Sequence, residues 1–167
     1  GYATTRNDPE GRPTIYDPLP SDTPHLAHVG RLDYATEGAL LLTNDGDLAQ
    51  ALLLPANHVP RVYLVKAREK LSREAIAKLE AGVPLDGRPT RGVVVEKLAG
   101  RTRHDWMQIT LFEGRNRHVR RIFEAIGHPV IRLIRTAFAG VSVDDLHPGQ
   151  YRRLTVAEIR DIETLVK

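Results

Sequence analysis

The sequence predicts an α+β protein built on a largely antiparallel sheet. Strand-like segments alternate with short amphipathic helices, and the connections are hairpin-sized rather than long crossovers. Turn signals at Asn44-Asp45-Gly46, Ala99-Gly100 and Pro148-Gly149 separate these segments. The chain has 167 residues, the size of one domain, and a chain of this length buries roughly 70% of its unfolded surface.

The first half of the chain is expected to contain one buried strand and one short helix. Residues 14–19 predict a single helical turn. The apolar segment 38–43 predicts a buried strand that ends at the Asn-Asp-Gly turn. Residues 47–54 predict a short helix, because Pro55 cannot continue it.

The middle of the chain predicts three strands and a helix. Residues 61–68 alternate imperfectly between apolar and polar side chains, as a strand with one buried face does. Ser72 can cap a helix over 73–81. Two further strands, joined by the turn at Ala99-Gly100, are expected at about 91–98 and 104–112.

Residues 116–126 form the clearest predicted helix, with Asn116 as its cap. Its apolar stripe, spaced i, i+3, i+4 and i+7, consists of Val119, Ile122, Phe123 and Ile126. At about 100° per residue, Arg120 falls closest to the buried edge, where it could pair with a carboxylate. Arg117 and Arg121 point outward on the same projection, where phosphates could be met. The residues alone do not identify the carboxylate.

The last segments predict two strands and a final helix. Residues 129–137 predict a strand, and a short strand over 150–154 is expected after the Pro-Gly turn. Thr155 and Glu158 have the spacing of a capping box, which predicts a helix to about residue 166.

Composition excludes several classes of function. The chain has no cysteine, which excludes disulfides, thiolate metal sites and cysteine nucleophiles. No apolar run is long enough to span a membrane, and the polar first residues are not a signal peptide. We therefore expect a cytoplasmic protein with no membrane partner.

Positive charge is concentrated in one segment. The formal net charge is +3, but Glu113–Thr136 alone contains six arginines and two glutamates. This concentration indicates an anionic partner at one face, because guanidinium groups suit phosphate binding. A solvated, ion-paired helix surface is the alternative explanation.

Polar residues interrupt the apolar stretch before the predicted strand at 38–43. Among them, Asp33 would be held at the sheet edge, either for chemistry or as a turn residue that bonds its own backbone. Asp33 and Glu37 are also a conceivable acid/base pair. His25 and His28 lack metal-ligand spacing. Asp45 and Asp47 fit a turn and a helix cap better than a calcium loop.

Two long motifs carry a family resemblance. Residues 30–46, GRLDYATEGALLLTNDG, and residues 113–140, EGRNRHVRRIFEAIGHPVIRLIRTAFAG, resemble the two signatures of the RsuA/RluB family of ribosomal RNA pseudouridine synthases. The opening residues 1–20 and the tail HPGQYRRLTVAEI are also similar to members that act on large-subunit RNA. The resemblance covers nearly the whole chain in the family's order.

The resemblance implies a reaction and a fold. The enzyme would isomerise a uridine in ribosomal RNA, expected to be 23S RNA, to pseudouridine, without a cofactor or metal. The fold would be a bent, mostly antiparallel mixed sheet with flanking helices and a central active-site cleft. All of 1–167 would be a catalytic domain, acting as a monomer, with no N-terminal RNA-binding domain in this chain.

The resemblance also implies site residues. Asp33 matches the catalytic aspartate, Tyr63 the tyrosine that lies against the target base, and Arg120 the basic residue that pairs with the aspartate. Residues expected to contact RNA are Arg31, Arg115, Arg117 and Arg121. Two rival functions are a non-catalytic RNA-binding module of the same fold and a hydrolase that would release free uracil.

Overall fold

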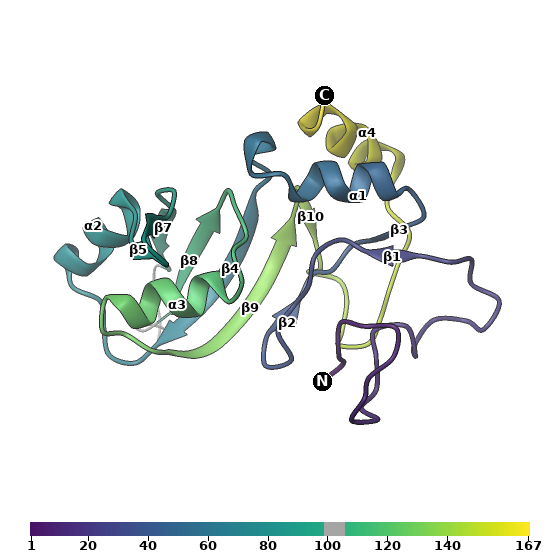
Figure 1. Ribbon diagram of the computed structural model, residues 1–167, viewed down its shortest axis with the longest axis horizontal. Helices are drawn as coiled ribbons and strands as arrows, with labels where there is room; N and C mark the ends of the chain where they lie inside the picture. The colour runs from purple at the N-terminus through teal and green to yellow at the C-terminus, as the bar shows by residue number, and fades with distance from the viewer. Residues whose placement is uncertain (99–105) are drawn as a thin grey trace.

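A computed structural model describes residues 1–98 and 106–167. Its main sheet has the strand order β10-β9-β4-β8-β7, and β2 adds to the edge of β9 (Figure 1). The longer strands of this sheet are β4 (Arg61–Ala67), β7 (Val94–Lys97), β8 (Trp106–Leu111) and β9 (Val130–Phe138). Every pairing in it is antiparallel except that of β2 with β9. The predicted α+β class with a mostly antiparallel mixed sheet is confirmed.

Short strands and a one-turn helix complete the chain. They are β1 (Ala27–His28), β2 (Glu37–Gly38), β3 (Leu42–Thr43), a 3-10 turn (Pro55–Asn57), β5 (Pro84–Leu85), β6 (Arg88–Pro89) and β10 (Val141–Ser142). β1 pairs with β3, and β5 pairs with β6, each as a two-stranded sheet outside the main one.

Three helices begin directly after a side-chain cap; those after Ser72 and Thr155 start where predicted, and the one after Asp45 starts one residue before the predicted position 47. They are α1 (Gly46–Leu53), α2 (Arg73–Ala81) and α4 (Val156–Leu165). Asp45 accepts a hydrogen bond from the N–H of Leu48, and Ser72 accepts one from the N–H of Ala75. The predicted capping box of Thr155 and Glu158 is present in both directions. These side chains satisfy backbone N–H groups that have no partner within the helix.

The predicted helix over 116–126 begins later than expected. α3 covers His118–Ala125, and the residue before it, Arg117, has a left-handed backbone with φ of 51°. Asn116 therefore does not cap the helix. The angular projection that placed Arg117 on the outer face does not apply to it, because Arg117 lies outside the helical backbone.

The predicted continuous strand over 38–43 is wrong. The chain there leaves one sheet and enters another, since β2 pairs with β9 whereas β3 pairs with β1. The break follows Gly38, the last residue of β2, which has φ of +125° and packs against the backbone of Arg135. A side chain at position 38 would clash with that backbone, so the close approach requires glycine. The change from one sheet to the other depends on pairing with distant strands, and the local sequence pattern does not reveal it.

The predicted strand over 150–154 is also wrong. Tyr151, Arg152 and Arg153 are exposed, and no ladder forms with β10. The carbonyl of Ser142 in β10 accepts instead from the guanidinium of Arg152, so the contact is made by a side chain. The predicted strands at 91–98 and 104–112 are present but shorter, and the turn at Ala99-Gly100 lies outside the described residues.

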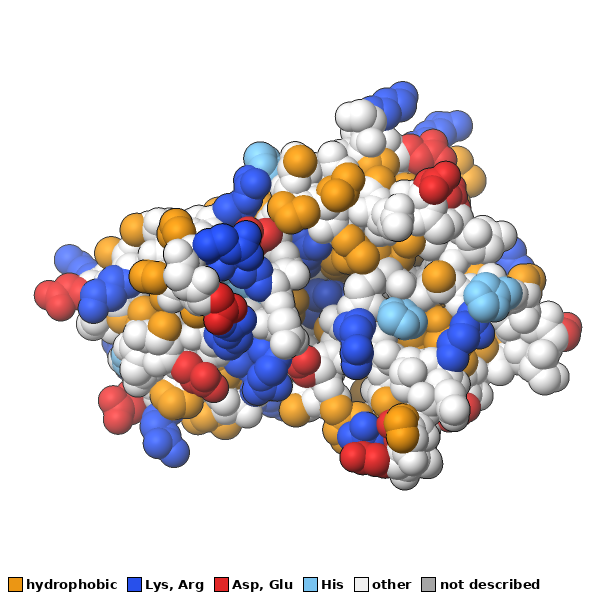
Figure 2. Space-filling model, in the orientation of Figure 1, with side chains coloured by type: hydrophobic (Ala, Val, Ile, Leu, Met, Phe, Trp, Pro, Cys, Tyr) orange, Lys and Arg blue, Asp and Glu red, His pale blue; other side chains and the backbone are white. Residues whose placement is uncertain are grey.

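Two apolar clusters pack around the sheet, and the cleft lies where they meet. One cluster joins β4, β8 and β9 to α2 and α3 through residues such as Val65, Ile109 and Phe123. The other joins α1 and α4 to the region of Phe138. Leu133 of the first cluster and Phe138 of the second both line the same cleft. Figure 2 shows lysine and arginine side chains on either side of the hollow in this face. Within the described ranges, none of the helices combines the length and apolarity that crossing a bilayer needs.

Replacing Gly38 by alanine should strongly destabilise the fold. A Cβ at Gly38 would lie 2.0 Å from the carbonyl oxygen of Arg135, and the positive φ adds strain. We expect the free energy of unfolding to fall by about 3 kcal/mol or more in urea denaturation. The control is Gly46→Ala at the first position of α1, where a Cβ meets nothing within 4 Å. Equal stabilities of the two variants would contradict the close approach at Gly38.

Candidate active site

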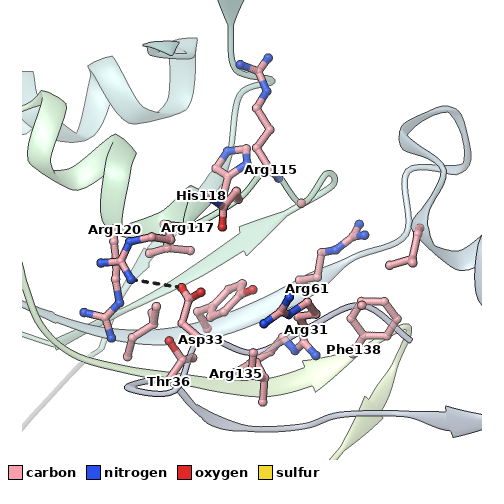
Figure 3. Close-up of a pocket in the computed structure, with 18 residues that line it drawn as sticks. Arg31, Asp33, Thr36, Arg61, Arg115, Arg117, His118, Arg120, Arg135 and Phe138 are labelled. Atoms are coloured by element: carbon pink, nitrogen blue, oxygen red, sulfur yellow. Dashed lines mark hydrogen bonds and ion pairs between the residues drawn. The ribbon is translucent and has the colours of Figure 1, made fainter. Parts of the chain in front are cut away.

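A cleft of about 470 Å³ crosses one face of the sheet at the ends of both apolar clusters. Four parts of the chain line it: the loop before β2, the middle of β4, the loop leading into α3, and β9 (Figure 3). The loop before β2 carries Asp33, and β4 carries Tyr63. The structure therefore brings together residues that are 30 positions apart in the sequence.

Asp33 opens a tight turn that leads into β2. The N–H of Thr36 donates to the carbonyl of Asp33 at 2.8 Å, so Asp33 does lie in a turn, and this bond is made by its backbone and not by its side chain. The carboxylate points across the cleft to the start of α3, where Oδ2 lies 3.7 Å from Nη1 of Arg117. The Asp33 side chain is one-third exposed and remains accessible from the cleft.

Arg120 holds the same turn in another way. Its Nη2 donates to the carbonyl of Ala35 at 3.2 Å, inside the turn that Asp33 opens. Arg120 is half-buried, as the helix projection predicts. Its expected pairing with the Asp33 carboxylate is not what the structure shows, because Arg117 occupies the ion-pair position. The left-handed backbone of Arg117 turns its side chain toward the cleft instead of outward.

Arg115 is turned away from solvent. Its guanidinium donates to the carbonyls of Leu85, Arg88 and Pro89, which fastens the β5–β6 hairpin beside the cleft. It also lies 3.6 Å from Glu113. Because these acceptors occupy its N–H groups, the expected RNA contact of Arg115 receives no support from the geometry.

The two other arginines expected to contact RNA lie nearer the surface. Nη2 of Arg121 lies 2.6 Å from the exposed carboxylate of Asp86. The hydrogen bond from Arg121 is the main reason why the pKa of Asp86 is lowered. Ion pairs this exposed contribute little to stability, so a phosphate can compete for Arg121. Arg31 is exposed at the edge of the cleft.

His118 is a buried neutral residue at the start of α3. Its Nδ1 accepts from the N–H of Arg115 at 3.1 Å, and its Nε2 lies 3.9 Å from Glu113. Burial lowers the pKa of His118 to about 4, which outweighs the opposite effect of Glu113. His118 thus shapes the loop that carries Arg115 and Arg117 and is uncharged near neutral pH.

Two buried arginines form the floor beside Tyr63. Arg61 and Arg135 are 3% and 4% exposed, and their guanidinium carbons lie 5.1 and 4.8 Å from the centre of the Phe138 ring. Such contacts of a cation with an aromatic face are favourable. Arg61 donates to the carbonyl of Val59 at 2.7 Å, and Arg135 donates through Nε to that of Ala39 at 2.8 Å.

A bulge in β9 puts these side chains on one face. Arg61 pairs with Phe138, whereas Tyr63 pairs with Arg135, so β9 has one additional residue over this interval. Side chains alternate along a strand, and without the extra residue Arg135 would point to the other face. The hydroxyl of the extra residue, Thr136, donates to the carbonyl of Val62.

The sequence analysis did not identify Arg61, Arg135, Phe138 or His118 as site residues. The sequence did place Arg61 and Arg135 within predicted strands. Because arginine is rarely buried in a strand unless it is paired or functional, both could have been considered as site residues. Their common face depends on the bulge, which has no local sequence signature. The described residues contain no group of three or more side chains arranged to hold a metal ion.

Comparison with known proteins gives consistent matches. The family model described as RNA pseudouridylate synthase matches residues 1–125. A ribosomal large subunit pseudouridine synthase B from Bacillus subtilis is 36% identical over 167 residues, covering 99% of this chain and 68% of that protein. Proteins of the same name from Yersinia pestis and Xanthomonas campestris are each 42% identical. This chain spans 56% and 35% of their lengths.

Solved structures resemble the fold. A crystal structure of a pseudouridylate synthase superimposes with a TM-score of 0.83 and 33% identity, covering 90% of this chain and 66% of that chain. A structure of an H/ACA RNP bound to a substrate RNA containing 2'-deoxyuridine has a TM-score of 0.55 at 20% identity. It covers 78% of this chain and 43% of that chain, and it supports the fold alone.

Stability should decrease with falling pH partly because of His118. The unfolded histidine takes up a proton near its ordinary pKa of 6.5, whereas the folded one resists protonation until about pH 4. The unfolded state therefore binds more protons in this window, and up to about 3 kcal/mol of stability is lost as the pH falls through it. His118→Asn retains an acceptor for the N–H of Arg115 and cannot titrate. Denaturation curves between pH 7 and 5 should show a shallower loss for this variant, and parallel losses would contradict the assignment.

Proposed function

The chain belongs to the RNA pseudouridylate synthase family, and on that basis we propose that it isomerises a uridine of large-subunit ribosomal RNA to pseudouridine. The names of its relatives support the substrate class. The observation that carries the proposal is the position of Asp33. Its carboxylate is held by a turn and an arginine at the edge of a cleft floored by Tyr63.

The proposed reaction uses Asp33 in one of two ways. In the first, a carboxylate oxygen bonds to C1′ of the ribose while the C1′–N1 bond breaks and its electron pair stays on N1. In the second, the carboxylate takes the C2′ proton, a C1′=C2′ double bond forms, and N1 again keeps the pair. The base then rotates and C5 bonds to C1′. In the first route the C1′–O bond to Asp33 breaks as C5 bonds, and in the second the Asp33 carboxyl group returns its proton to C2′, so either route regenerates the carboxylate. C5 then loses its proton and N1 gains one.

Tyr63 is the proposed platform for the base. It lies in the middle of β4, half-buried, and lines the same cleft as Asp33. The enzyme must extrude the uridine from structured RNA, which costs a few kcal/mol. Stacking on an aromatic ring returns roughly 1–3 kcal/mol per base.

Arg117 and Arg120 are proposed to orient the carboxylate from two sides. Arg117 pairs with the charge itself, and Arg120 fixes the turn through the carbonyl of Ala35. A nucleophile or base held in one direction reacts faster than a freely rotating one. Arg31 and Arg121, at the rim of the cleft and on α3, are proposed to meet the RNA backbone.

Asp33→Asn tests the proposal directly. The amide can neither bond to C1′ nor take the C2′ proton, so tritium release from C5-labelled uridine in 23S ribosomal RNA should fall at least about a thousandfold. RNA affinity should survive, because phosphate contacts dominate it. Glu37→Gln is the matched control, since Glu37 is four residues away, exposed and paired with Arg132. Normal release by Asp33→Asn, or loss of release by Glu37→Gln alone, would contradict the assignment. Accumulation of free uracil would indicate the hydrolase instead.

Tyr63 should contribute through its ring. Tyr63→Phe keeps the stacking face, so substrate affinity in filter binding should be preserved. Tyr63→Ala removes a contact of roughly 1–3 kcal/mol and should slow single-turnover conversion by about tenfold or more. The control is Tyr151→Ala, because Tyr151 is exposed and outside the cleft. A Tyr63→Ala enzyme with the unmodified rate would show that the base binds elsewhere.

A further inference from the structure

The two buried arginines of the cleft floor have no acidic partner that accounts for their burial. Neither Arg61 nor Arg135 lies within 4.0 Å of a carboxylate in the described part of the chain, and both are at least 96% buried. Backbone carbonyls and the Phe138 ring contact both guanidinium groups, Tyr63 interacts favourably with each, and Glu113 attracts Arg61 from beyond ion-pair distance. Burying an unpaired charge is costly, so such a pair is expected where the protein needs positive charge.

One nitrogen of the Arg135 guanidinium makes no hydrogen bond within the described residues. This nitrogen, Nη2, is buried, although the side chain lines the cleft (Figure 3). Burial lowers the pKa of Arg135, and the neighbouring Tyr63 hydroxyl acts in the opposite direction. Arginine side chains keep their proton in proteins, so Arg135 is treated as a cation. A fixed positive charge therefore lies directly beside the tyrosine on which the base is proposed to stack.

The reaction moves a negative charge toward this place. Before it starts, the charge is on the Asp33 carboxylate and the base is neutral. After the C1′–N1 bond breaks, Asp33 is an ester or a neutral acid, and the electron pair on N1 makes the detached uracil a monoanion. Both routes for Asp33 produce this same shift of charge from the carboxylate to the base.

We propose that Arg61 and Arg135 together provide the fixed positive charge that stabilises the detached uracil anion in the cleft. The inference rests on the proposed function. The pair is positioned before the reaction by the Phe138 ring, by two backbone carbonyls and by the β9 bulge, so the charge need not reorganise when the anion forms. Arg135 lies beside Tyr63, and neither arginine exchanges atoms with the base: each acts on the anion through its charge.

The dependence of the rate on the leaving base distinguishes this role from a structural one. Fluorine at C5 withdraws electrons and stabilises the uracil anion, so cleavage of 5-fluorouridine requires less help from a nearby cation. The experiment compares single-turnover cleavage of the C1′–N1 bond in a 23S RNA fragment made with uridine or with 5-fluorouridine. Loss of the N-linked nucleoside is followed after nuclease digestion.

Removing either charge should affect the two substrates unequally. Arg135→Gln should slow uridine cleavage about a hundredfold, as loss of one preorganised donor does, and 5-fluorouridine cleavage much less. The ratio of the 5-fluorouridine rate to the uridine rate should thus rise about tenfold or more. Arg61→Gln should show the same signature, and Arg135→Lys, which keeps a charge, should retain a ratio near that of the parent enzyme.

The ratio is measured within one preparation, so partial unfolding lowers both rates and leaves it unchanged. If Arg135→Gln does not fold, Arg61→Gln and Arg135→Lys decide the question. Arg73→Gln, which removes an exposed arginine from the first position of α2, is the control and should change neither rate. An unchanged ratio in both glutamine variants, with an active parent enzyme, overturns the inference alone. A parent enzyme that cleaves neither nucleotide overturns the proposed function as well.

Discussion

The pairing of β4 with β9 determines which side chains reach the cleft. Its bulge places Arg135 opposite Tyr63 and Phe138 opposite Arg61, so that all four lie on one face. The same stretch of β9 receives β2 on its outer edge, where the N–H of Ala39 donates to the carbonyl of Arg135 at 2.7 Å. The close approach at Gly38 makes that contact possible, and the turn that carries Asp33 leads directly into it. The Asp33 carboxylate and the floor of the cleft are thus positioned by one set of backbone contacts.

Most arginines of the basic segment from Glu113 onward contact other parts of the protein. The arginine-rich segment from Glu113 onward suggested a surface for RNA, yet most of its arginines have intramolecular acceptors. Arg115 fastens the β5–β6 hairpin, Arg117 faces Asp33, and Arg120 holds the turn of Asp33. Guanidinium groups suit these tasks because five N–H donors can bind several carbonyls at once. The residues that remain for phosphate contacts lie at the rim, where Arg31 is exposed and Arg121 has only a surface partner.

Local signals predicted much of this structure, and long-range contacts account for what they missed. The caps at Asp45, Ser72 and Thr155 are short-range patterns, and each helix begins where its cap indicates. The ion pair of Asp33 is made by Arg117. A helical projection did not predict it, because the backbone of Arg117 is left-handed and not helical. The role of Arg135 depended on a bulge that is set by pairing with a strand more than 60 positions away. The motif resemblance located Asp33 and Tyr63, but it did not indicate the charges beneath them.

The proposed activity of this chain is the modification of a uridine in ribosomal RNA. The most direct measurement is a map of pseudouridine across ribosomal RNA from cells with and without the gene, at single-nucleotide resolution. We expect that one or a few sites in 23S RNA lose the modification and regain it when the gene is restored. Identical maps in the two strains, or a change confined to another class of RNA, would contradict it.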